Sequence, residues 1–296
     1  MIAVAGATGY IGGLLCKRLR GEGLEVRALA RHPERAGELK DAGCEVVRAD
    51  VLEAETLGPA LAGVDVAYYL VHSMGRGSDG DFAARDQEGA ENFAAAAAAA
   101  GVKRVVYLGG LGEGSKHLDS RHRTAETLRR GAVPIVYFRA AAVLGAGSES
   151  FRTAFYLVRR LPLMITPRWV TTRTQPVAVA DAVAYLAGAA DLELPVEREI
   201  EIGGPDVTTY GGMIDELARA QGRRPPLRIT VPLLTPFLSS LWIGLVTPVD
   251  AGVAKPLIEG LATETVVDDP AGMELFPAVE RTPLRQALVA ALAERG

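Results

Sequence analysis

Short apolar runs alternate with amphipathic segments along the first half of the chain. The apolar runs predict strands over residues 2–5, 24–30, 44–49, 64–71, 102–108 and 134–139. Apolar positions at helical spacing predict helices over residues 11–21, 33–42, 53–62, 81–100 and 120–130. Strands separated by helices indicate a parallel sheet with right-handed crossovers. The fold class that follows is α/β, a Rossmann-type doubly wound parallel sheet.

The pattern loosens after residue 145. A strand is predicted over residues 197–202, and helices over residues 150–160, 180–190, 210–221 and 284–294. We expect residues 1–145 to form a cofactor-binding Rossmann core. Residues 146–296 then form a small interleaved C-terminal α/β lobe for the substrate with a C-terminal extension, and elements at about 176–203 return to the core.

The composition is that of an ordinary globular protein, with 49% hydrophobic and 23% charged residues and a net charge of −4. Charges of both signs are interspersed, which argues against nucleic acid as a partner. Cys16 and Cys44 are not in a CxxC motif, so we expect small buried side chains. The four histidines are scattered, and no metal site is predicted.

The chain begins directly on a predicted strand without a basic, apolar leader, and we expect a cytoplasmic protein. Residues 229–249 carry no charge and are long enough to span a bilayer. Prolines and hydroxyl residues interrupt this stretch, so we expect a buried lid or pocket wall and no stable membrane span. The alanine tract of residues 94–100 favours a helix that packs on the sheet or on a second subunit of a homodimer.

The strongest motif lies at the first strand-to-helix turn, where Gly6, Gly9 and Gly12 have the spacing GxxGxxG. Gly6 suits a tight turn, Gly9 allows a pyrophosphate to approach the backbone, and Gly12 allows the helix to pack closely on the strand. The free N–H groups at the start of the helix then bind the anion. The other predicted cofactor contacts in this turn are Thr8, Tyr10 and Ile11.

The end of the second predicted strand indicates which cofactor is bound. An NAD site places an acid there to bind the ribose 2′-hydroxyl, whereas this chain has Arg31 and Arg35 and no acid at the strand tip. A guanidinium is suited to a phosphate. We therefore predict NADP(H), with Arg31 on the 2′-phosphate and Arg35 assisting. The alternative is two solvated surface arginines.

Three further strand ends should line the same cleft, because ligands bind at the carboxyl ends of parallel strands. Asp50 can accept a hydrogen bond from the adenine amino group, with the Val51 amide beside it, or can cap the following helix. The other predicted cofactor contacts are Leu70 and Val71, and the paired Gly109 and Gly110, where the backbone can approach nicotinamide or ribose.

These motifs, GATGYIGG, the arginine after the second strand, Asp50-Val51, YLVHSM and VVYLGGLG, resemble the atypical or extended short-chain dehydrogenase/reductase superfamily. The chain is most similar to its NAD(P)H-binding, NmrA-like group, often labelled nucleoside-diphosphate-sugar epimerase. Later segments such as FRAAAVLGAGS and QPVAVADAVAYL extend the similarity over nearly the whole chain. The resemblance implies an NADP-binding Rossmann domain with a small C-terminal substrate lobe.

Active members of that superfamily use a Tyr-x-x-x-Lys pair with a Ser or Thr at the tip of the fifth strand. This chain has Gly109-Gly110 at that tip and SRHRTAE at the helix, without a tyrosine. His122 is the candidate proton donor because imidazole titrates near neutral pH. Arg121 or Arg123 can hold the ribose or pyrophosphate. The alternative is that all three are solvated residues of a helical turn.

A substrate space is expected between the strand tips and the C-terminal lobe. Arg139 can meet an anionic group there or form an internal salt bridge. The other candidate wall residues, for which core packing is the alternative, are His72, Met74, Phe151, Phe155 and Trp169. Their apolar character favours an apolar or aromatic substrate.

We therefore expect an NADPH-dependent oxidoreductase that acts on a small, largely apolar carbonyl or enone. The second hypothesis is a non-catalytic NADP(H)-binding protein, such as a redox sensor or an assembly factor, and the missing dyad favours it. A nucleotide-sugar epimerase ranks third, because that reaction must move a proton in both directions.

Overall fold

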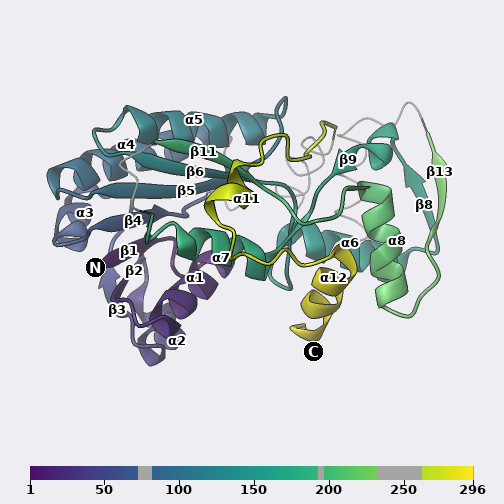
Figure 1. Ribbon diagram of the computed structural model, residues 1–296, viewed down its shortest axis with the longest axis horizontal. Helices are drawn as coiled ribbons and strands as arrows, with labels where there is room; N and C mark the ends of the chain where they lie inside the picture. The colour runs from purple at the N-terminus through teal and green to yellow at the C-terminus, as the bar shows by residue number, and fades with distance from the viewer. Residues whose placement is uncertain (73–81, 193–196, 232–261, 296) are drawn as a thin grey trace.

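The computed structural model describes residues 1–72, 82–192, 197–231 and 262–295. Its centre is a seven-stranded sheet in the order β11-β6-β5-β4-β1-β2-β3, with every neighbouring pair parallel (Figure 1). The strands are β1 (Ile2–Ala5), β2 (Val26–Ala30), β3 (Glu45–Arg48), β4 (Val66–Tyr69), β5 (Arg104–Gly110), β6 (Ile135–Ala140) and β11 (Arg198–Ile202). The strand order reverses at β1, between β4 and β2, where doubly wound sheets bind their ligands. The predicted fold class is confirmed.

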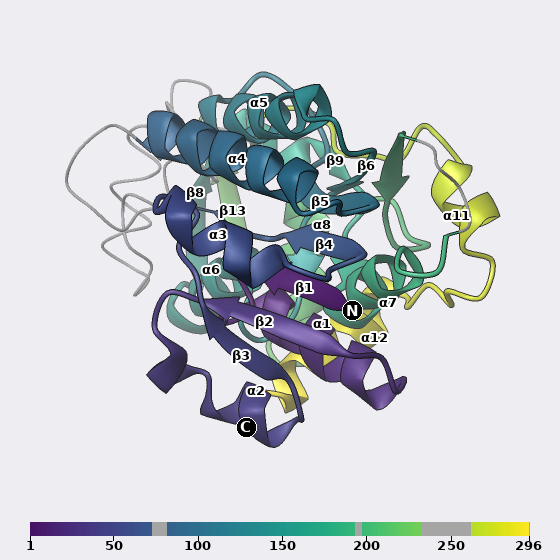
Figure 2. The ribbon, with the colours of Figure 1, turned by 90° about the vertical axis from the view of Figure 1, so that its left-hand side faces the viewer.

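Helices cover both faces of this sheet (Figure 2). One face bears α1 (Tyr10–Gly21), α2 (Gly37–Asp41) and α7 (Val179–Gly188), and the other bears α3 (Ala54–Leu61), α4 (Phe82–Ala99) and α5 (Lys116–Arg130). The central strands β1 and β4 are apolar on both sides because both of their faces are buried, whereas the edge strands β3 and β11 carry exposed charged residues.

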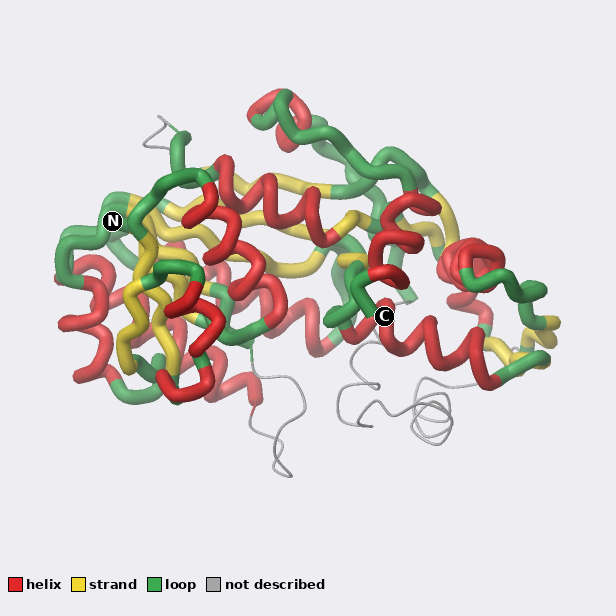
Figure 3. The backbone as a smooth tube through the Cα atoms, turned by 90° about the horizontal axis from the view of Figure 1, so that it is seen from below, coloured by secondary structure: helices red, strands yellow, loops and turns green. Residues whose placement is uncertain are grey.

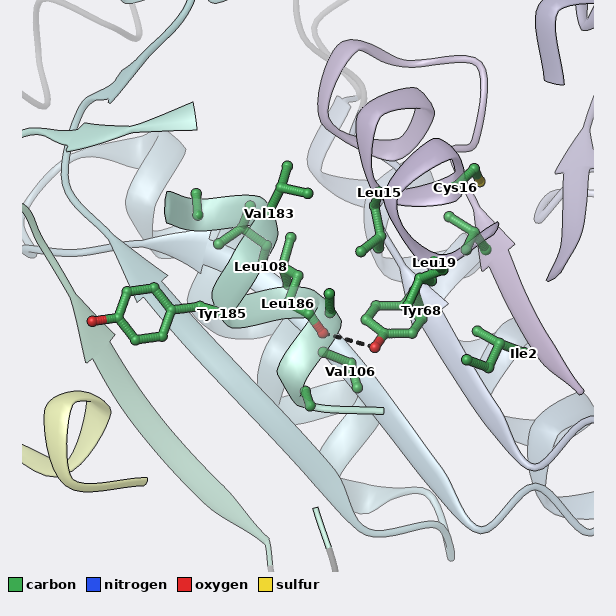
Figure 4. Packing of buried hydrophobic residues seen from close by; sticks show 14 of the residues in the cluster. Ile2, Leu15, Cys16, Leu19, Tyr68, Val106, Leu108, Val183, Tyr185 and Leu186 are labelled. Atoms are coloured by element: carbon green, nitrogen blue, oxygen red, sulfur yellow. Dashed lines mark hydrogen bonds between the residues drawn. The ribbon is translucent and has the colours of Figure 1, made fainter. Parts of the chain in front are cut away.

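The core between the sheet and the helices α1 and α7 brings together residues far apart in sequence (Figure 4). Leu15 and Leu19 of α1 are fully buried there beside Tyr68 of β4. The Tyr68 hydroxyl donates a hydrogen bond of 2.7 Å to the carbonyl oxygen of Leu186 in α7. This bond satisfies a buried polar group and fixes α7 on the sheet.

The later part of the chain forms a second group of elements with its own core, at the end away from the N-terminus (Figure 3). Its helices are α6 (Glu149–Arg160), α8 (Tyr210–Ala220) and α12 (Leu284–Ala293), and the short α11 (Ala271–Leu275) lies against β11. Its strands form the pairs β7 (Val143–Leu144) with β10 (Val177–Ala178), β9 (Arg173–Thr174) with β12 (Thr208–Thr209), and β8 (Leu163–Thr166) with β13 (Leu227–Thr230). These strands are too short for alternation to identify them from sequence.

Two helix predictions need correction. The helix expected over residues 33–42 is broken into the 3₁₀ turn η1 (Pro33–Arg35) and α2. The helix expected from Ser120 begins at Lys116, because the Ser115 hydroxyl accepts a hydrogen bond of 3.2 Å from the Leu118 amide and so caps it. Ser120 therefore lies inside the helix, where its side chain is buried.

The uncharged stretch that we expected to be buried begins in β13. Ile229 is 54% exposed, so this described part of the stretch is not buried, and residues 232–249 lie outside the described residues. In the ranges that the structure describes, no helix has the length and hydropathy needed to cross a bilayer.

Candidate cofactor and active site

The turn from β1 to α1 is built from close contacts between backbones. Gly6 has a φ of +82°, and a β-carbon there would lie 2.5 Å from the carbonyl oxygen of Leu70. A β-carbon at Gly12 would lie 2.2 Å from the carbonyl oxygen of Gly6. The Gly9 amide donates to that same oxygen at 2.9 Å. The glycines therefore hold the turn tightly against the tip of β4 and the start of α1.

The N-terminus of α1 is open to an anion. Gly9 is its N-cap, no described side chain caps the helix, and its first turn holds no acidic residue. Thr8 and Gly9 are exposed at this end. Unsatisfied amides and the positive end of the helix dipole therefore face solvent, which is the arrangement that binds a diphosphate. The residues present fit a dinucleotide.

Two other predicted contacts in this turn point elsewhere. The Tyr10 hydroxyl donates a hydrogen bond of 2.9 Å to Glu294 after α12, and its ring packs so closely on Gly147 that a β-carbon there would lie 2.4 Å from the ring. Burial and Glu294 raise the Tyr10 pKa to about 12. The side chain of Ile11 packs against the core cluster. Both side chains thus have contacts within the protein, and the cofactor contacts of these two residues stay a prediction.

The tip of β2 presents positive charge. Arg31 and Arg35 are both exposed, and neither forms an ion pair with any residue that the structure describes. The nearby Glu34 lies 3.3 Å from His32. The two guanidinium groups are therefore available to a phosphate beyond the end of β2.

The Asp50 carboxylate is engaged in a local turn. Its Oδ1 accepts a hydrogen bond of 3.0 Å from the Leu52 amide, and the cap position of α3 belongs to Glu53. Asp50 therefore does not cap α3, as one alternative expected, but forms an Asx turn just before the helix. The Val51 carbonyl accepts a hydrogen bond of 2.9 Å from the Asn92 side chain. The contact of Asp50 with adenine stays a prediction.

At the tip of β4, Leu70 and Val71 are half-buried and lead to His72. Its Nδ1 lies 3.6 Å from Asp86 Oδ2 in α4. Burial, with a smaller effect of Arg121 in α5, lowers the His72 pKa to about 4, although Asp86 opposes the shift. His72 is therefore a neutral imidazole at pH 7. Met74 lies outside the described residues.

The paired glycines at the tip of β5 make room for the protein's own side chains. A β-carbon at Gly109 would lie 2.6 Å from the ring of Tyr137, and one at Gly110 would lie 2.5 Å from Leu118. Packing of these two side chains accounts for the lack of a β-carbon at both positions, and the approach of nicotinamide or ribose to this backbone stays a prediction.

His122 is held on both sides by the protein. Its Nε2 lies 3.0 Å from the carbonyl oxygen of Gly112, and its Nδ1 lies 3.0 Å from the Tyr137 hydroxyl. A carbonyl oxygen can only accept, so a neutral imidazole has its proton on Nε2 and accepts from Tyr137 at Nδ1. Burial raises the Tyr137 pKa, which keeps the hydroxyl protonated as the donor. Two contacts with protein groups thus hold the His122 ring in place, whereas the alternative interpretation expected a solvated side chain.

Sequence reasoning missed Tyr137. It stacks on Tyr107 at 5.3 Å between ring centres, and Tyr107 lies 6.1 Å from Tyr69. The three tyrosines share one register across β4, β5 and β6. Tyr107 and Tyr137 are visible in the sequence near the ends of two predicted strands, but only the strand register places them side by side.

The other predicted substrate contacts have separate places. Arg139 forms the internal salt bridge, with Nη1 2.9 Å from Glu199 and 3.6 Å from Glu201. Phe151 and Phe155 are buried in the core of the later part of the chain. The backbone of Trp169 lies in the 3₁₀ turn η2 (Arg168–Thr171). Of this set, the structure places His72 at the strand tips near the cofactor turn.

The NAD(P)H-binding family matches residues 6–147. A (4-alkanoyl-5-oxo-2,5-dihydrofuran-3-yl)methyl phosphate reductase of Streptomyces griseus is 30% identical over 77% of this chain and 76% of its own. The chain belongs to the atypical short-chain dehydrogenase/reductase family. This is a family of NAD(P)H-dependent reductases, and the predicted cofactor, NADP(H), agrees with it.

Two other proteins are similar to this chain. A photosystem II assembly factor of Guillardia theta is 34% identical over 80% of this chain and 75% of its own. The structure of a Citrobacter triphenylmethane reductase with NADP(H) superposes with a TM-score of 0.77 at 21% identity, covering 98% of this chain and 100% of that one. This last similarity concerns the fold.

Proposed function

We propose that this family member is an NADPH-dependent reductase of a small, largely apolar carbonyl or enone. The observation that supports it most is the open start of α1 beside two exposed arginines, Arg31 and Arg35, at a strand tip without an acid. The amides of the first turn of α1 would hold the diphosphate, and Arg31, assisted by Arg35, the 2′-phosphate. When bound, the cofactor supplies the hydride.

The substrate class draws support from the Streptomyces griseus relative. The compound in its name has a ring double bond conjugated to carbonyl groups and an alkanoyl chain. That is an enone with an apolar arm, like the substrate predicted from the sequence, and it also carries a phosphate group, which a largely apolar substrate lacks. The division at about residue 145 into a cofactor core and a substrate lobe stays a prediction, as do a cytoplasmic location and a homodimer.

His122 is the candidate catalytic residue. Its Nε2 proton now binds the Gly112 carbonyl, and a substrate oxygen in place of that carbonyl would receive the same hydrogen bond. A neutral imidazole can stabilise negative charge that develops on a carbonyl oxygen. Tyr137 is a positioning residue, because its hydroxyl fixes the ring and its tautomer. The proton itself then comes from solvent.

Calorimetric titration with NADPH and with NADH tests the cofactor assignment. Replacing Arg31 by Ala removes a charge-assisted phosphate contact, so we expect NADPH affinity to fall at least ~10-fold, with NADH affinity unchanged. Lys40→Ala, an exposed charge in α2, is the matched control. Equal affinity of the native protein for both cofactors, or an unchanged preference in Arg31→Ala, would refute it.

Turnover tests the chemistry. We expect NADPH consumption with an alkanoyl-substituted unsaturated lactone or another apolar enone from a panel, and His122→Ala to lower kcat with unchanged NADPH affinity. Tyr137→Phe should lower kcat more than it changes KM. The substitution removes the hydroxyl that orients the His122 ring, but it leaves the imidazole itself in place. Undiminished kcat in His122→Ala would remove this residue from the mechanism.

The second candidate is a non-catalytic NADP(H)-binding assembly factor. The similarity to the Guillardia theta protein favours it, together with the absence of a hydroxyl at Gly109 and of the usual tyrosine in α5. Tight NADPH binding with no oxidation by any compound of the panel would support this function over the reductase.

A further inference from the structure

The strands β8 and β13 lie side by side as a two-stranded ribbon (Figure 1). The outer face of this ribbon is apolar. Leu163 pairs with Leu227, and Ile165 with Ile229. These four side chains are 46%, 73%, 46% and 54% exposed, respectively. A strand with one face in solvent normally alternates apolar inward with polar outward. Among the residues that the structure describes, this ribbon therefore presents a contiguous aliphatic surface that is left exposed.

The inner face of the same ribbon is already used. Met164 is 3% exposed in the core of the later part of the chain. Arg228 donates a hydrogen bond of 2.7 Å to the Gly211 carbonyl and forms an ion pair with Asp215. The ribbon is thus anchored from within, and the outer aliphatic side chains are not needed to hold it in place.

Residues 150–180 and 217–231, which supply the strands of this ribbon and their flanks, contain nine arginines and neither aspartate nor glutamate. Four of these arginines pair with carboxylates outside the two ranges, namely Arg152, Arg173, Arg219 and Arg228. The loops before the two strands lie together, since the Leu227 amide donates to the Pro162 carbonyl at 3.0 Å and Arg223 to the Arg159 carbonyl at 3.3 Å.

Four exposed arginines gather at these loops. Arg159, Arg223 and Arg224 have no carboxylate partner among the residues that the structure describes. Arg160 extends over the ring of Tyr156, 5.1 Å from its centre. Guanidinium groups at the rim of an aliphatic surface match a layer that offers phosphates outside and hydrocarbon inside.

We propose that this ribbon and its four arginines form a docking surface for an anionic lipid bilayer. Leu163, Ile165, Leu227 and Ile229 would enter the boundary of the acyl chains, and the arginines would bind lipid phosphates. A second copy of the chain fits less well, because a two-fold contact through the ribbon would bring the arginines of both copies together. The surface requires no membrane-spanning helix.

Flotation of the full chain with vesicles tests the proposal. We expect binding to vesicles of equal parts phosphatidylglycerol and phosphatidylcholine, little binding to phosphatidylcholine alone, and weaker binding as salt rises. Arg223→Gln with Arg224→Gln should lower the partition coefficient roughly 25-fold, about fivefold for each charge. Leu227→Gln with Ile229→Thr should lower it roughly 10-fold or more.

Matched control variants away from the ribbon show whether binding depends on this surface or on the charge and hydrophobicity of the protein in general. Lys40→Gln and Met273→Thr change an exposed cation and an exposed apolar residue on α2 and α11, and should leave vesicle binding unchanged. NADPH affinity should be unchanged in every variant, which shows that each one is folded. The proposal is overturned by failure to bind the anionic vesicles, by equal binding of the ribbon variants, or by self-association that the ribbon variants abolish.

Discussion

Gly12 and Gly13 are adjacent in the first turns of α1, yet the structure predicts opposite effects of replacing them with alanine. A β-carbon at Gly12 would lie 2.2 Å from the Gly6 carbonyl oxygen, so the turn and the helix must separate by about 1 Å to reach ordinary contact. A β-carbon at Gly13 would lie 3.4 Å from the Ala7 carbonyl oxygen, which is already ordinary contact.

The magnitudes follow from two opposing effects. Alanine in place of glycine stabilises a helix by up to about 1 kcal/mol, and both variants gain this. Overpacking costs about 1–3 kcal/mol, and only Gly12→Ala meets it in full. We therefore expect Gly12→Ala to lose up to about 2 kcal/mol, with Tm falling by up to about 3 °C, and Gly13→Ala to be neutral or slightly stabilised.

The same displacement moves the amides proposed to hold the diphosphate. A hydrogen bond to a charged group contributes about 1.5–3 kcal/mol, so losing one amide contact should lower NADPH affinity about 10-fold or more in Gly12→Ala. In Gly13→Ala the affinity should stay within about twofold. Thermal unfolding and calorimetric titration of both variants give the two measurements. Equal Tm and equal affinity in the two variants would refute the argument that backbone contact at Gly12 shapes the turn.

Two further predictions concern the tips of β5 and β4. Gly109→Ser should destabilise the protein by about 1–3 kcal/mol in urea unfolding, because its β-carbon would meet the Tyr137 ring at 2.6 Å. The double variant Gly109→Ser with Tyr137→Val should lose less stability than the sum of the two single variants, because the smaller side chain removes the clash. Strictly additive losses of stability would contradict this contact. The unfolded chain protonates His72 below its ordinary pKa of 6.5, whereas the folded chain does so only near 4. Its contribution to stability is therefore complete above about pH 6.5 and is lost as pH falls toward 4, by about 2 kcal/mol between pH 7 and pH 5. His72→Gln should flatten that dependence, and an unchanged slope would show that another group causes it.

The residues missed at the site share one cause, which is that their partners lie on other elements. The Tyr137 hydroxyl meets His122 only because β6 pairs with β5 in register and α5 packs beside both. From the sequence, Arg139 could bind a substrate anion or form an internal salt bridge. The pairing of β11 with β6 places Glu199 beside it, and the salt bridge forms. The helix expected to start at Ser120 begins at Lys116, because the Ser115 hydroxyl accepts a hydrogen bond from the Leu118 amide and caps it.

By itself, the sequence determined the alternation of buried strands and helices, the glycine turn at the start of α1, and the replacement of an acid by Arg31 after β2. These features follow from local properties: side-chain periodicity, the conformational freedom of glycine and the charge of one residue. Only the tertiary structure decided what fills the space at Gly109, how His122 is held, and that Leu163 and Leu227 lie side by side on an outer face. Those outcomes depend on strand register and helix packing between residues far apart in the chain, because contact with a distant partner is a property of the fold and not of either residue alone.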